Sequence, residues 1–245
     1  PKTYNMCINA LSEKLILAEK SGKLPKIVVP VHFAGQPCDM PVIHNLSKRY
    51  GFKIIEDASH AIGASYDQIK IGSCTHSDIT VFSFHPIKII TSAEGGMALT
   101  NNNEVANKIF RLRSHGITSE KNRMKEQSKD EIWNYQQIDL GYNYRMNDIQ
   151  AALGLSQLKR VDVYVKIRNK IAEFYNSELN TLNIQLPFHS PKTYSSYHLY
   201  PIRIKNNLTP KTQQQIYDAL WDKDIAANLL YIPVHRQPYY ENLGF

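Results

Sequence analysis

Short runs of β-branched and other apolar residues alternate with helix-like stretches along the first half of the chain. Runs of this kind, bounded by polar or turn residues, occupy positions 26–31, 52–55, 78–84 and 96–100. Apolar runs of this length are typical of parallel strands buried on both faces. We therefore predict four strands, the second of which ends at the acidic pair Glu56-Asp57.

Helix-like spacing occupies the intervals between these runs. Apolar residues recur at helical intervals within residues 39–50, and Gly51 follows where a helix C-cap is expected. Asn102 or Asn103 can cap another helix, which runs to about Arg113. Strands joined by helices in this order predict an α/β fold with a mainly parallel sheet.

The chain changes in character at Ser114. Residues 114–137 are polar and charged without periodicity, which predicts a long mobile loop. Asn147 then caps a strong helix with apolar residues through Leu158, and a further helix covers roughly residues 163–179.

The remainder predicts a second, smaller unit of the α+β type. An apolar run at 197–204 is followed by a helix near 210–223 and a short apolar stretch at 229–232. We place the division inside the long helix, so that residues 1–165 form part of a large domain and residues 166–245 part of a small C-terminal domain.

The composition is that of a soluble globular protein. The chain has 245 residues, 42% of them hydrophobic, and no apolar run long enough to span a membrane. No signal peptide is visible, and the three cysteines fit no CxxC pattern, so we expect reduced thiols and a cytoplasmic protein. The chain does not begin with Met, and we expect it to be a piece of a longer protein.

The net charge of +7 and the isoelectric point near 9.2 raise the question of nucleic-acid binding. The basic residues are scattered, however, and the densest stretch, 108–129, is interleaved with acidic residues. The chain carries no RNP-like, zinc-finger or helix-turn-helix signature. A positive field that attracts a diphosphate-bearing small molecule explains the charge equally well. We therefore expect no nucleic-acid partner, and we assign no metal ligands.

Lys88 is the residue on which a chemical interpretation depends. It is flanked by Ile87, Ile89 and Ile90, and no acidic residue follows until Glu94. Desolvation disfavours the ammonium form of a lysine and makes the amine nucleophilic. Taken by itself, Lys88 is more simply an ordinary loop lysine whose aliphatic stem packs on Ile and Pro.

Asp57 changes that balance. Asp57 and the loop 83–88 both fall at the carboxyl ends of predicted strands, where open α/β sheets bind ligands. A lysine that forms a Schiff base and an aspartate that holds a proton on a pyridine nitrogen are what the chemistry of pyridoxal 5′-phosphate (PLP) requires of a protein. The sequence therefore points to a PLP site at this edge of the sheet.

Simpler interpretations of the neighbouring residues stay open at this point. Asp57 is also a common helix cap or turn former, and His60 is also a common hydrogen-bonded structural histidine. Ser83 can reach a phosphate held beside Lys88, but a serine in a strand is uninformative alone. Glu94-Gly95-Gly96 lets backbone approach a ligand closely, or simply forms a turn.

Joined in this order, these segments resemble the sugar aminotransferases of the DegT/DnrJ/EryC1/StrS family, which are PLP enzymes of fold type I. The resemblance covers nearly the whole chain. It is carried by Val31–Met40 (VHFAGQPCDM), Glu56–Tyr66 (EDASHAIGASY), Phe82–Lys88 (FSFHPIK) and Leu140–Asp148 (LGYNYRMND). The first three runs are most similar to the branch of the family that makes pseudaminic acid precursors.

The resemblance implies a role for each matching residue. Lys88 would form the Schiff base with PLP and move protons between the cofactor and the sugar carbon. Asp57 would pair with the pyridine nitrogen, His60 would contact the ring or its 3-hydroxyl, and Ser83 would contact the phosphate. Asn143 resembles the residue by which one subunit reaches the other's cofactor phosphate, which implies a homodimer with shared active sites.

The same branch implies a substrate. Its enzymes aminate C4 of a UDP-linked 4-keto-6-deoxy-N-acetylhexosamine, with glutamate as amino donor. Asn228, Leu229, Leu230 and Tyr231, together with His235, resemble a region that contacts the sugar nucleotide. Family members usually have His where this chain has Leu230, so the chain departs from the pattern at a substrate-contacting position.

Family members also begin upstream of Pro1 and continue beyond Phe245, so we expect the chain to lack part of the cofactor pocket. Two alternatives follow. A PLP-dependent sugar dehydratase of the same family typically replaces the Schiff-base lysine with histidine, whereas Lys88 is present. A catalytically inactive sugar-nucleotide-binding or regulatory homologue is favoured by truncation. It is opposed by the joint presence of four residues: Asp57, Ser83, Lys88 and Asn143.

Overall fold

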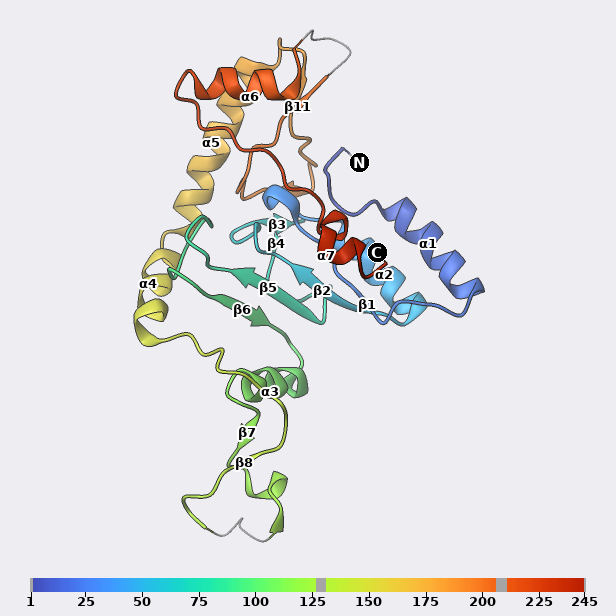
Figure 1. The fold of residues 1–245 in the computed structure, drawn as a ribbon, viewed down its shortest axis with the longest axis vertical. Coiled ribbons are helices and arrows are strands. Elements are labelled where there is room, and N and C mark those ends of the chain that lie inside the picture. Colours follow the sequence, from blue (N-terminus) through green and yellow to red (C-terminus); the bar gives the residue numbers. More distant parts are fainter. Residues whose placement is uncertain (1, 127–130, 206–210, 245) are drawn as a thin grey trace. The chain divides into compact units, whose positions relative to one another are not determined.

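The computed structural model describes residues 2–126, 131–205 and 211–244. The chain divides into two compact units, which we describe separately. Unit 1 comprises Pro1–Glu178 and Leu186–Pro201, and unit 2 comprises Leu179–Gln185 and Ile202–Phe245. Figure 1 labels their helices and strands.

Unit 1 is built from helices and short strands that alternate along much of its length. Its helices are α1 (Ile8–Lys20), η1 (Phe33–Gly35), α2 (Met40–Tyr50), α3 (Asn103–Leu112), η2 (Lys121–Arg123), α4 (Asp148–Leu158) and α5 (Val161–Leu179). Its strands are β1 (Ile27–Val28), β2 (Lys53–Asp57), β3 (Ser65–Tyr66), β4 (Ile69–Lys70), β5 (Ile79–Ser83), β6 (Gly96–Leu99), β7 (Ile117–Thr118), β8 (Gln136–Gln137) and β10 (Thr193–Tyr194).

A four-stranded sheet of order β1-β2-β5-β6 forms the centre of unit 1 (Figure 1). β1 runs parallel to β2, and β2 runs parallel to β5. β6 runs antiparallel to β5, with Ser83 opposite Gly96. The prediction of an α/β fold with a mainly parallel sheet is therefore confirmed. Because β5 and β6 are antiparallel neighbours, the chain between them turns back at the carboxyl end of β5, which places that loop beside the end of β2.

Local capping explains where the helices begin and end. Gly51 adopts φ 78° after α2, a left-handed conformation that glycine takes without strain, as a helix C-cap requires. The Asn102 side chain accepts hydrogen bonds from the backbone N–H groups of Glu104 and Val105 at the start of α3. Asn147 and Gln150 form a capping box at the start of α4. The predicted positions of these helices are confirmed.

Two hydrophobic clusters form the core of unit 1. One lies between α1, α2 and the strands β1 and β2, and consists of Leu15, Val28, Cys38, Met40, Ile43, Tyr50, Phe52 and Ile54. The other lies near the carboxyl ends of β2 and β5 and consists of Ala58, Ala61, Ala64, Phe82, Phe84, Ile89, Ile90 and Val165. The second cluster fixes the two residues that follow Lys88, because Ile89 and Ile90 belong to it.

The sequence of the polar segment 114–137 predicts an irregular loop, but the structure places two short strands in it. β7 pairs with β8 in an antiparallel ladder, and the turn η2 lies between them. Residues 127–130 lie outside the described part of the chain. The two ends of the segment therefore have a regular backbone pairing that its sequence, without hydrophobic periodicity, does not indicate, and the predicted mobility stays a prediction.

A three-stranded sheet of order β10-β3-β4 brings the late segment 186–201 into unit 1. β10 runs antiparallel to β3, with Thr193 opposite Tyr66. The Gln36 side chain donates a hydrogen bond to the Thr193 hydroxyl at 2.6 Å. These contacts hold the residues that follow β10 next to the end of β2.

Unit 2 contains β9 (Ile184–Gln185), β11 (Arg203–Ile204), α6 (Gln213–Trp221), η4 (Val234–Arg236) and α7 (Pro238–Glu241). β9 and β11 pair antiparallel, and Thr212 with Gln215 forms a capping box for α6. The predicted helix near 210–223 is confirmed as α6, and its predicted first residue, Pro210, lies outside the described residues. The expected boundary between residues 165 and 166 concerns the domains of a complete enzyme and stays a prediction; here α5 continues unbroken through it.

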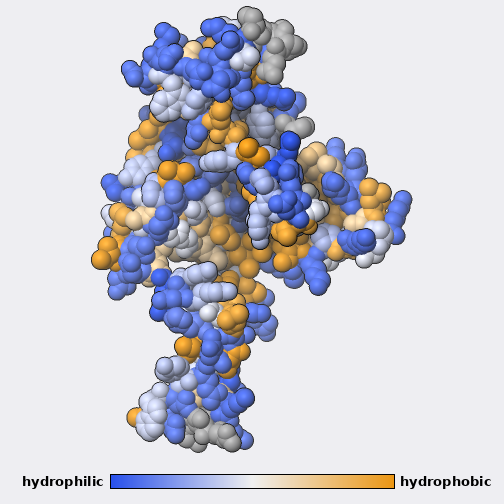
Figure 2. Space-filling view, in the orientation of Figure 1, coloured by the Kyte–Doolittle hydropathy of each residue, from blue (hydrophilic) through white to orange (hydrophobic). Residues whose placement is uncertain are grey.

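Several apolar side chains in the central sheet or just after its strand β1 are exposed. Val29, Val31 and Met97 keep 41–48% of their surface accessible, and Figure 2 shows hydrophobic residues gathered over this sheet. Among the described residues, no helix is long and apolar enough to cross a membrane. In the same residues, no group of three or more His, Cys, Asp or Glu side chains could hold a metal ion.

Candidate active site

Asp57 and Lys88 come from neighbouring strands of the central sheet. Asp57 is the last residue of β2 and pairs in register with Val81 of β5. Lys88 lies in the loop between β5 and β6, where its backbone N–H donates to the His85 carbonyl at 2.9 Å. The ends of the parallel strands β2 and β5 therefore bring the two side chains within electrostatic reach of each other.

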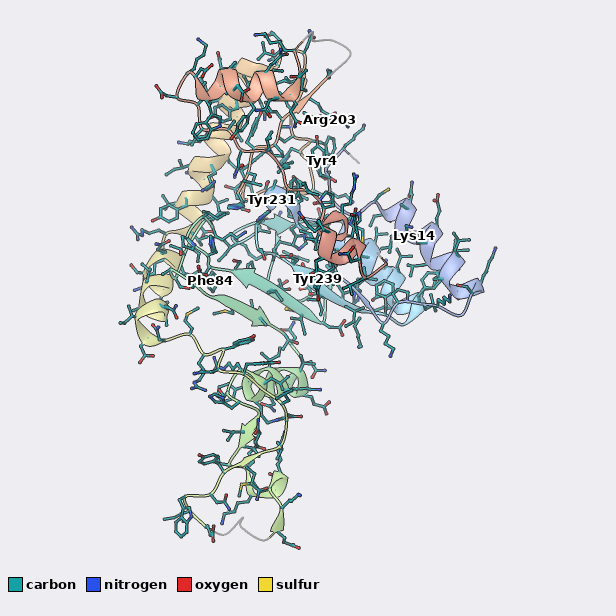
Figure 3. All side chains as sticks on the ribbon, viewed as in Figure 1. Tyr4, Lys14, Phe84, Arg203, Tyr231 and Tyr239 are labelled. Carbon is teal, nitrogen blue, oxygen red and sulfur yellow. The ribbon has the colours of Figure 1, made fainter. Side chains whose placement is uncertain are left out.

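The loop that carries Lys88 is closed by backbone hydrogen bonds at its base. Phe84, labelled in Figure 3, donates its backbone N–H to the Gly95 carbonyl at 2.8 Å, and its carbonyl accepts from the Ser92 backbone at 3.0 Å. Gly95 adopts φ 156°, and a Cβ there would meet Ser92 Oγ at 2.5 Å and Met146 Cε at 2.6 Å. Close packing against Ser92 and Met146 thus explains why this position is a glycine, so its place in a turn is a sufficient interpretation.

The environment of Lys88 favours a neutral amine. The side chain is half-buried, and burial lowers the pKa of the Lys88 amine, while the Asp57 carboxylate opposes this shift. The lowered pKa increases the fraction of free amine at neutral pH, and the free amine is the nucleophilic form.

His60 is held as a neutral ring. Burial, the largest cause, and the nearby Lys88 together lower the pKa of His60 to about 4, although the Asp57 carboxylate opposes the shift. The His60 Nδ1 accepts a hydrogen bond from the Ala34 backbone N–H at 3.3 Å. A neutral imidazole that accepts at Nδ1 carries its proton on Nε2, so the free edge of His60 presents an N–H donor.

A buried network of hydrogen bonds fixes the end of β2, next to Asp57. Glu56, the residue before Asp57, accepts a hydrogen bond from His32 Nε2 at 2.7 Å and from the Thr80 hydroxyl at 3.2 Å. His32 Nδ1 accepts from the Cys38 backbone N–H at 3.0 Å, so the proton of this ring lies on Nε2 and faces Glu56. The His32 and Glu56 side chains are 0% and 5% exposed. The network ties β2, β5 and the turn η1 together.

His198 and Arg168 are site neighbours that the sequence did not indicate. The rings of His60 and His198 lie 4.5 Å apart between centroids, inclined by 40°. Arg168 of α5 donates to the backbone carbonyls of Tyr197 and His198, at 3.0 Å and 3.3 Å. No local motif marks either residue. His198 reaches this place because the sheet β10-β3-β4 and hydrogen bonds from Gln36 and Ser196 hold the late segment 186–201 there.

The remaining predicted cofactor ligands occupy different positions. Ser83 ends β5, and its hydroxyl accepts from the His85 backbone N–H at 3.4 Å, so it lies in the same loop as Lys88. Asn143 is exposed and forms an isolated antiparallel bridge with Ser114. The structure thus brings together Lys88, Asp57, His60 and the Ser83 end of β5, and pairs Asn143 with another segment. The roles of all five stay predictions.

The predicted substrate-contacting residues belong to unit 2. Asn228, Leu229, Leu230 and Tyr231 lie in the irregular segment after α6, and His235 lies in η4. All are exposed, Tyr231 at 72% of its surface (Figure 3). Their role stays a prediction.

Comparisons with known proteins identify the family. The model of the DegT/DnrJ/EryC1/StrS aminotransferase family matches residues 1–245. A UDP-4-amino-4,6-dideoxy-N-acetyl-beta-L-altrosamine transaminase of Campylobacter jejuni is 38% identical over 218 residues, which cover 87% of this chain and 54% of that protein. An uncharacterized protein of Methanocaldococcus jannaschii is 37% identical over 244 residues, which cover 98% of this chain and 60% of that protein.

The fold has close counterparts among solved structures. PseC of Helicobacter pylori, an aminotransferase involved in the biosynthesis of pseudoaminic acid, superposes with a TM-score of 0.85 at 31% identity, covering 99% of this chain and 61% of that one. The chain therefore spans about 60% of the length of such relatives. The match of the family model along the whole chain and the shared fold show that this chain belongs to the DegT/DnrJ/EryC1/StrS aminotransferase family.

Proposed function

We propose that the protein containing this chain is a PLP-dependent nucleotide-sugar aminotransferase with Lys88 as its catalytic residue. One observation carries the proposal: a carboxylate and a neutral imidazole at the end of β2 meet an amine of lowered pKa from the loop that follows β5. Enzymes of this family use PLP, which when bound supplies a reactive aldehyde carbon and an electron-accepting pyridine ring.

The residues present fit that cofactor. A half-buried lysine of lowered pKa suits covalent attachment to an aldehyde. Asp57 supplies a carboxylate for a protonated ring nitrogen, and its Oδ1 is already oriented by the Ser59 backbone N–H at 3.0 Å. The Nε2–H edge of His60 suits an oxygen on the ring. Ser83 and the backbone that follows it offer a hydroxyl and N–H groups for a phosphate.

Lys88 would act through its Nζ atom in two ways. As a free amine it holds the cofactor, and when released it takes a proton from one carbon and returns it to another. Both roles require the free amine, and burial lowers the pKa of Lys88 and so raises the fraction of free amine.

Asp57 would hold a proton on the pyridine nitrogen of PLP. A carboxylate fixed beside that nitrogen stabilises the protonated ring electrostatically, and a protonated ring accepts electrons more readily. The buried Glu56–His32 pair keeps the strand under Asp57 in place, so the carboxylate does not have to reorganise during the reaction.

A homodimer with shared active sites completes the proposal. Asn143 lies on an exposed segment paired with Ser114, away from any role in its own unit's core. We propose that Asn143 of one subunit contacts the cofactor phosphate bound by the other. Cross-complementation tests this: mixing Lys88→Ala and Asn143→Ala subunits should form dimers with one intact site and recover activity that neither variant has alone.

For the substrate we propose a UDP-linked 4-keto-6-deoxy-N-acetylhexosamine, aminated at C4 with glutamate as donor. The support is the 38% identity to the Campylobacter jejuni transaminase and the structural likeness to PseC. The residues proposed to contact the sugar nucleotide are Asn228, Leu229, Leu230, Tyr231 and His235.

The assay for this proposal offers glutamate with a panel of UDP- and dTDP-linked 4-keto sugars to the protein at its natural length, loaded with PLP. Amination of the UDP-N-acetyl substrate ahead of the others supports the proposal. A clear preference for dTDP sugars would remove this substrate while leaving the aminotransferase assignment intact. Loss of a hydroxyl without amination would identify a dehydratase.

A further inference from the structure

His198 packs directly against the candidate active site, although it lies far along the chain from the other residues there. Its side chain is 8% exposed, and its ring stacks obliquely on His60 at 4.5 Å between centroids. We propose that His198 is a positioning residue, which holds His60 as the neutral tautomer with its proton on Nε2. The inference rests on the proposed cofactor role of His60 and deepens it.

The segment that carries His198 is clamped from several sides. The Ser196 hydroxyl donates to the His60 carbonyl at 2.8 Å, and the Ser196 backbone N–H donates to the Gly35 carbonyl at 3.1 Å. Arg168 holds the His198 carbonyl from α5, and Asn169 donates to the Ser195 carbonyl at 2.9 Å. The position of the His198 ring against His60 is therefore fixed by bonds that do not involve the ring itself.

The same clamp fixes the other partner of His60. The turn η1 is bonded to the His198 segment through Gly35 and through the Ala34 carbonyl, which accepts from the Leu199 backbone N–H at 3.3 Å. Ala34 in turn donates its own N–H to His60 Nδ1. The hydrogen bonds between η1 and the His198 segment thus fix both the residue that packs on one face of the His60 ring and the N–H group that donates to its Nδ1.

The His198 ring can cover one face of His60 without adding a charge only if His198 is itself uncharged, and its surroundings keep it uncharged. Its Nδ1 is buried and has no hydrogen-bond partner among the described residues. An imidazolium would place a charged N–H there, and a buried charge without a partner costs much more than a buried lone pair. Burial is the largest cause that lowers the pKa of His198 to about 3, and the nearby His60, Lys88 and Arg168 would each repel a positive charge on it.

A neutral His198 has a direct consequence for His60. The ring excludes water from His60 without adding a charge, and exclusion of water is the largest cause of the lowered His60 pKa. The charged groups that act on His60 are Lys88, which lowers its pKa, and Asp57, which raises it. With water admitted, His60 would take up a proton in mildly acidic solution and compete with Lys88 for Asp57.

The test is the pKa and tautomer of His60 measured by ¹⁵N NMR in the cofactor-free protein at its natural length, with labelled histidine. The wild-type protein should show a His60 pKa of about 4 and a proton on Nε2. His198→Ala should raise that pKa by about one unit or more, because it admits water. His198→Phe should keep it low, because it restores an uncharged ring of similar shape.

His189→Ala is the matched control, since His189 is exposed in the same segment and stacks on Tyr197 rather than on His60. It should leave the His60 pKa unchanged. The proposal is overturned if His198→Ala titrates His60 as the wild type does, or if wild-type His60 carries its proton on Nδ1. Because the readout needs neither cofactor nor turnover, a negative result here is distinct from failure of the aminotransferase proposal.

Discussion

Removing the charge of Glu56 should destabilise the protein more than any comparable change at its surface. Glu56 and His32 form a 2.7 Å pair that is almost wholly buried, and Thr80 adds a second bond to the same carboxylate. Glu56→Gln keeps the shape but replaces a charge-assisted bond with a neutral one. Charge-assisted bonds contribute about 1.5–3 kcal/mol and neutral ones about 0.5–1.5 kcal/mol, so we expect a loss of about 1–2 kcal/mol.

Removing one partner altogether should cost more. Glu56→Ala leaves the buried Nε2–H of His32 without an acceptor, which typically costs about 1–3 kcal/mol, and the lost packing of the Glu56 side chain adds to this cost. The double variant His32→Leu with Glu56→Leu removes both polar groups, so its cost should fall well below the sum of the single costs. The difference between the cost of the double variant and the sum of the two single costs is the interaction free energy of His32 with Glu56, and a large value shows that the two residues stabilise the fold as a pair.

The assay is chemical denaturation of the protein at its natural length, followed by the shift of the midpoint at constant slope. Asp162→Asn is the matched control: its pair with Lys70 has side chains 80% and 60% exposed, and its loss should change stability by less than about 0.5 kcal/mol. A Glu56→Gln protein as stable as the wild type would refute the reasoning.

The pH dependence of this contribution has a definite sign. Burial raises the pKa of Glu56, but the hydrogen bonds that its carboxylate accepts from His32 and Thr80 outweigh burial and lower this pKa below its ordinary value of 4.5. A carboxylate with a depressed pKa stabilises the folded state above its unfolded pKa. The difference between wild type and Glu56→Gln should therefore be full at pH 7 and shrink as the pH falls below about 4.5.

Three further outcomes follow from the same geometry. Asp57→Asn should still bind PLP but lose several orders of magnitude in turnover, measured as kcat with a saturating sugar nucleotide; near-normal kcat would remove its assigned role. Gly35 has φ 95°, and an added Cβ would lie 2.9 Å from the His60 carbonyl oxygen, so Gly35→Ala should lower the free energy of unfolding by at least about 2 kcal/mol in chemical denaturation. The control Gly51→Ala, whose Cβ would meet nothing within 4 Å, should cost about 1 kcal/mol, and equal costs would contradict the predicted clash. Because the pKa values of His60 and His198 are lowered from 6.5 to about 4 and about 3, the unfolded chain binds more protons below pH 6.5, so the denaturation midpoint should fall as the pH is lowered from 7 to 5; an unchanged midpoint would mean that these rings are not held neutral.

Local signals predicted the elements that end in strong caps. Gly51, Asn102 and Asn147 each act through hydrogen bonds or backbone conformations within a few residues, so the helices that they terminate could be placed from the sequence. The helix α1 was not predicted, although Ile8, Leu11 and Leu15 recur on one helical face. Its N-cap residue, Cys7, makes no side-chain cap hydrogen bond, and packing against α2 supplies the stability that local signals do not.

The candidate site could be predicted only where its residues follow strands. Asp57 and Lys88 end or follow neighbouring strands, and the rule for ligands at carboxyl ends of an α/β sheet brings them together. His198 reaches the site through sheet pairing and hydrogen bonds from a distant segment, and those contacts leave no periodic or motif-like trace. The β7–β8 ladder was missed for a related reason, because it depends on backbone bonds between polar residues.

The central claim is that Lys88 carries the cofactor, and peptide mapping after borohydride reduction tests it most directly. The protein at its natural length is loaded with PLP, reduced, digested and mapped by mass spectrometry. The account predicts one labelled peptide, containing Lys88, and no specific label in Lys88→Ala, whereas a Lys70→Ala control keeps the label on Lys88. Label that spreads over other lysines, or that persists in the Lys88→Ala protein at wild-type yield, would contradict it.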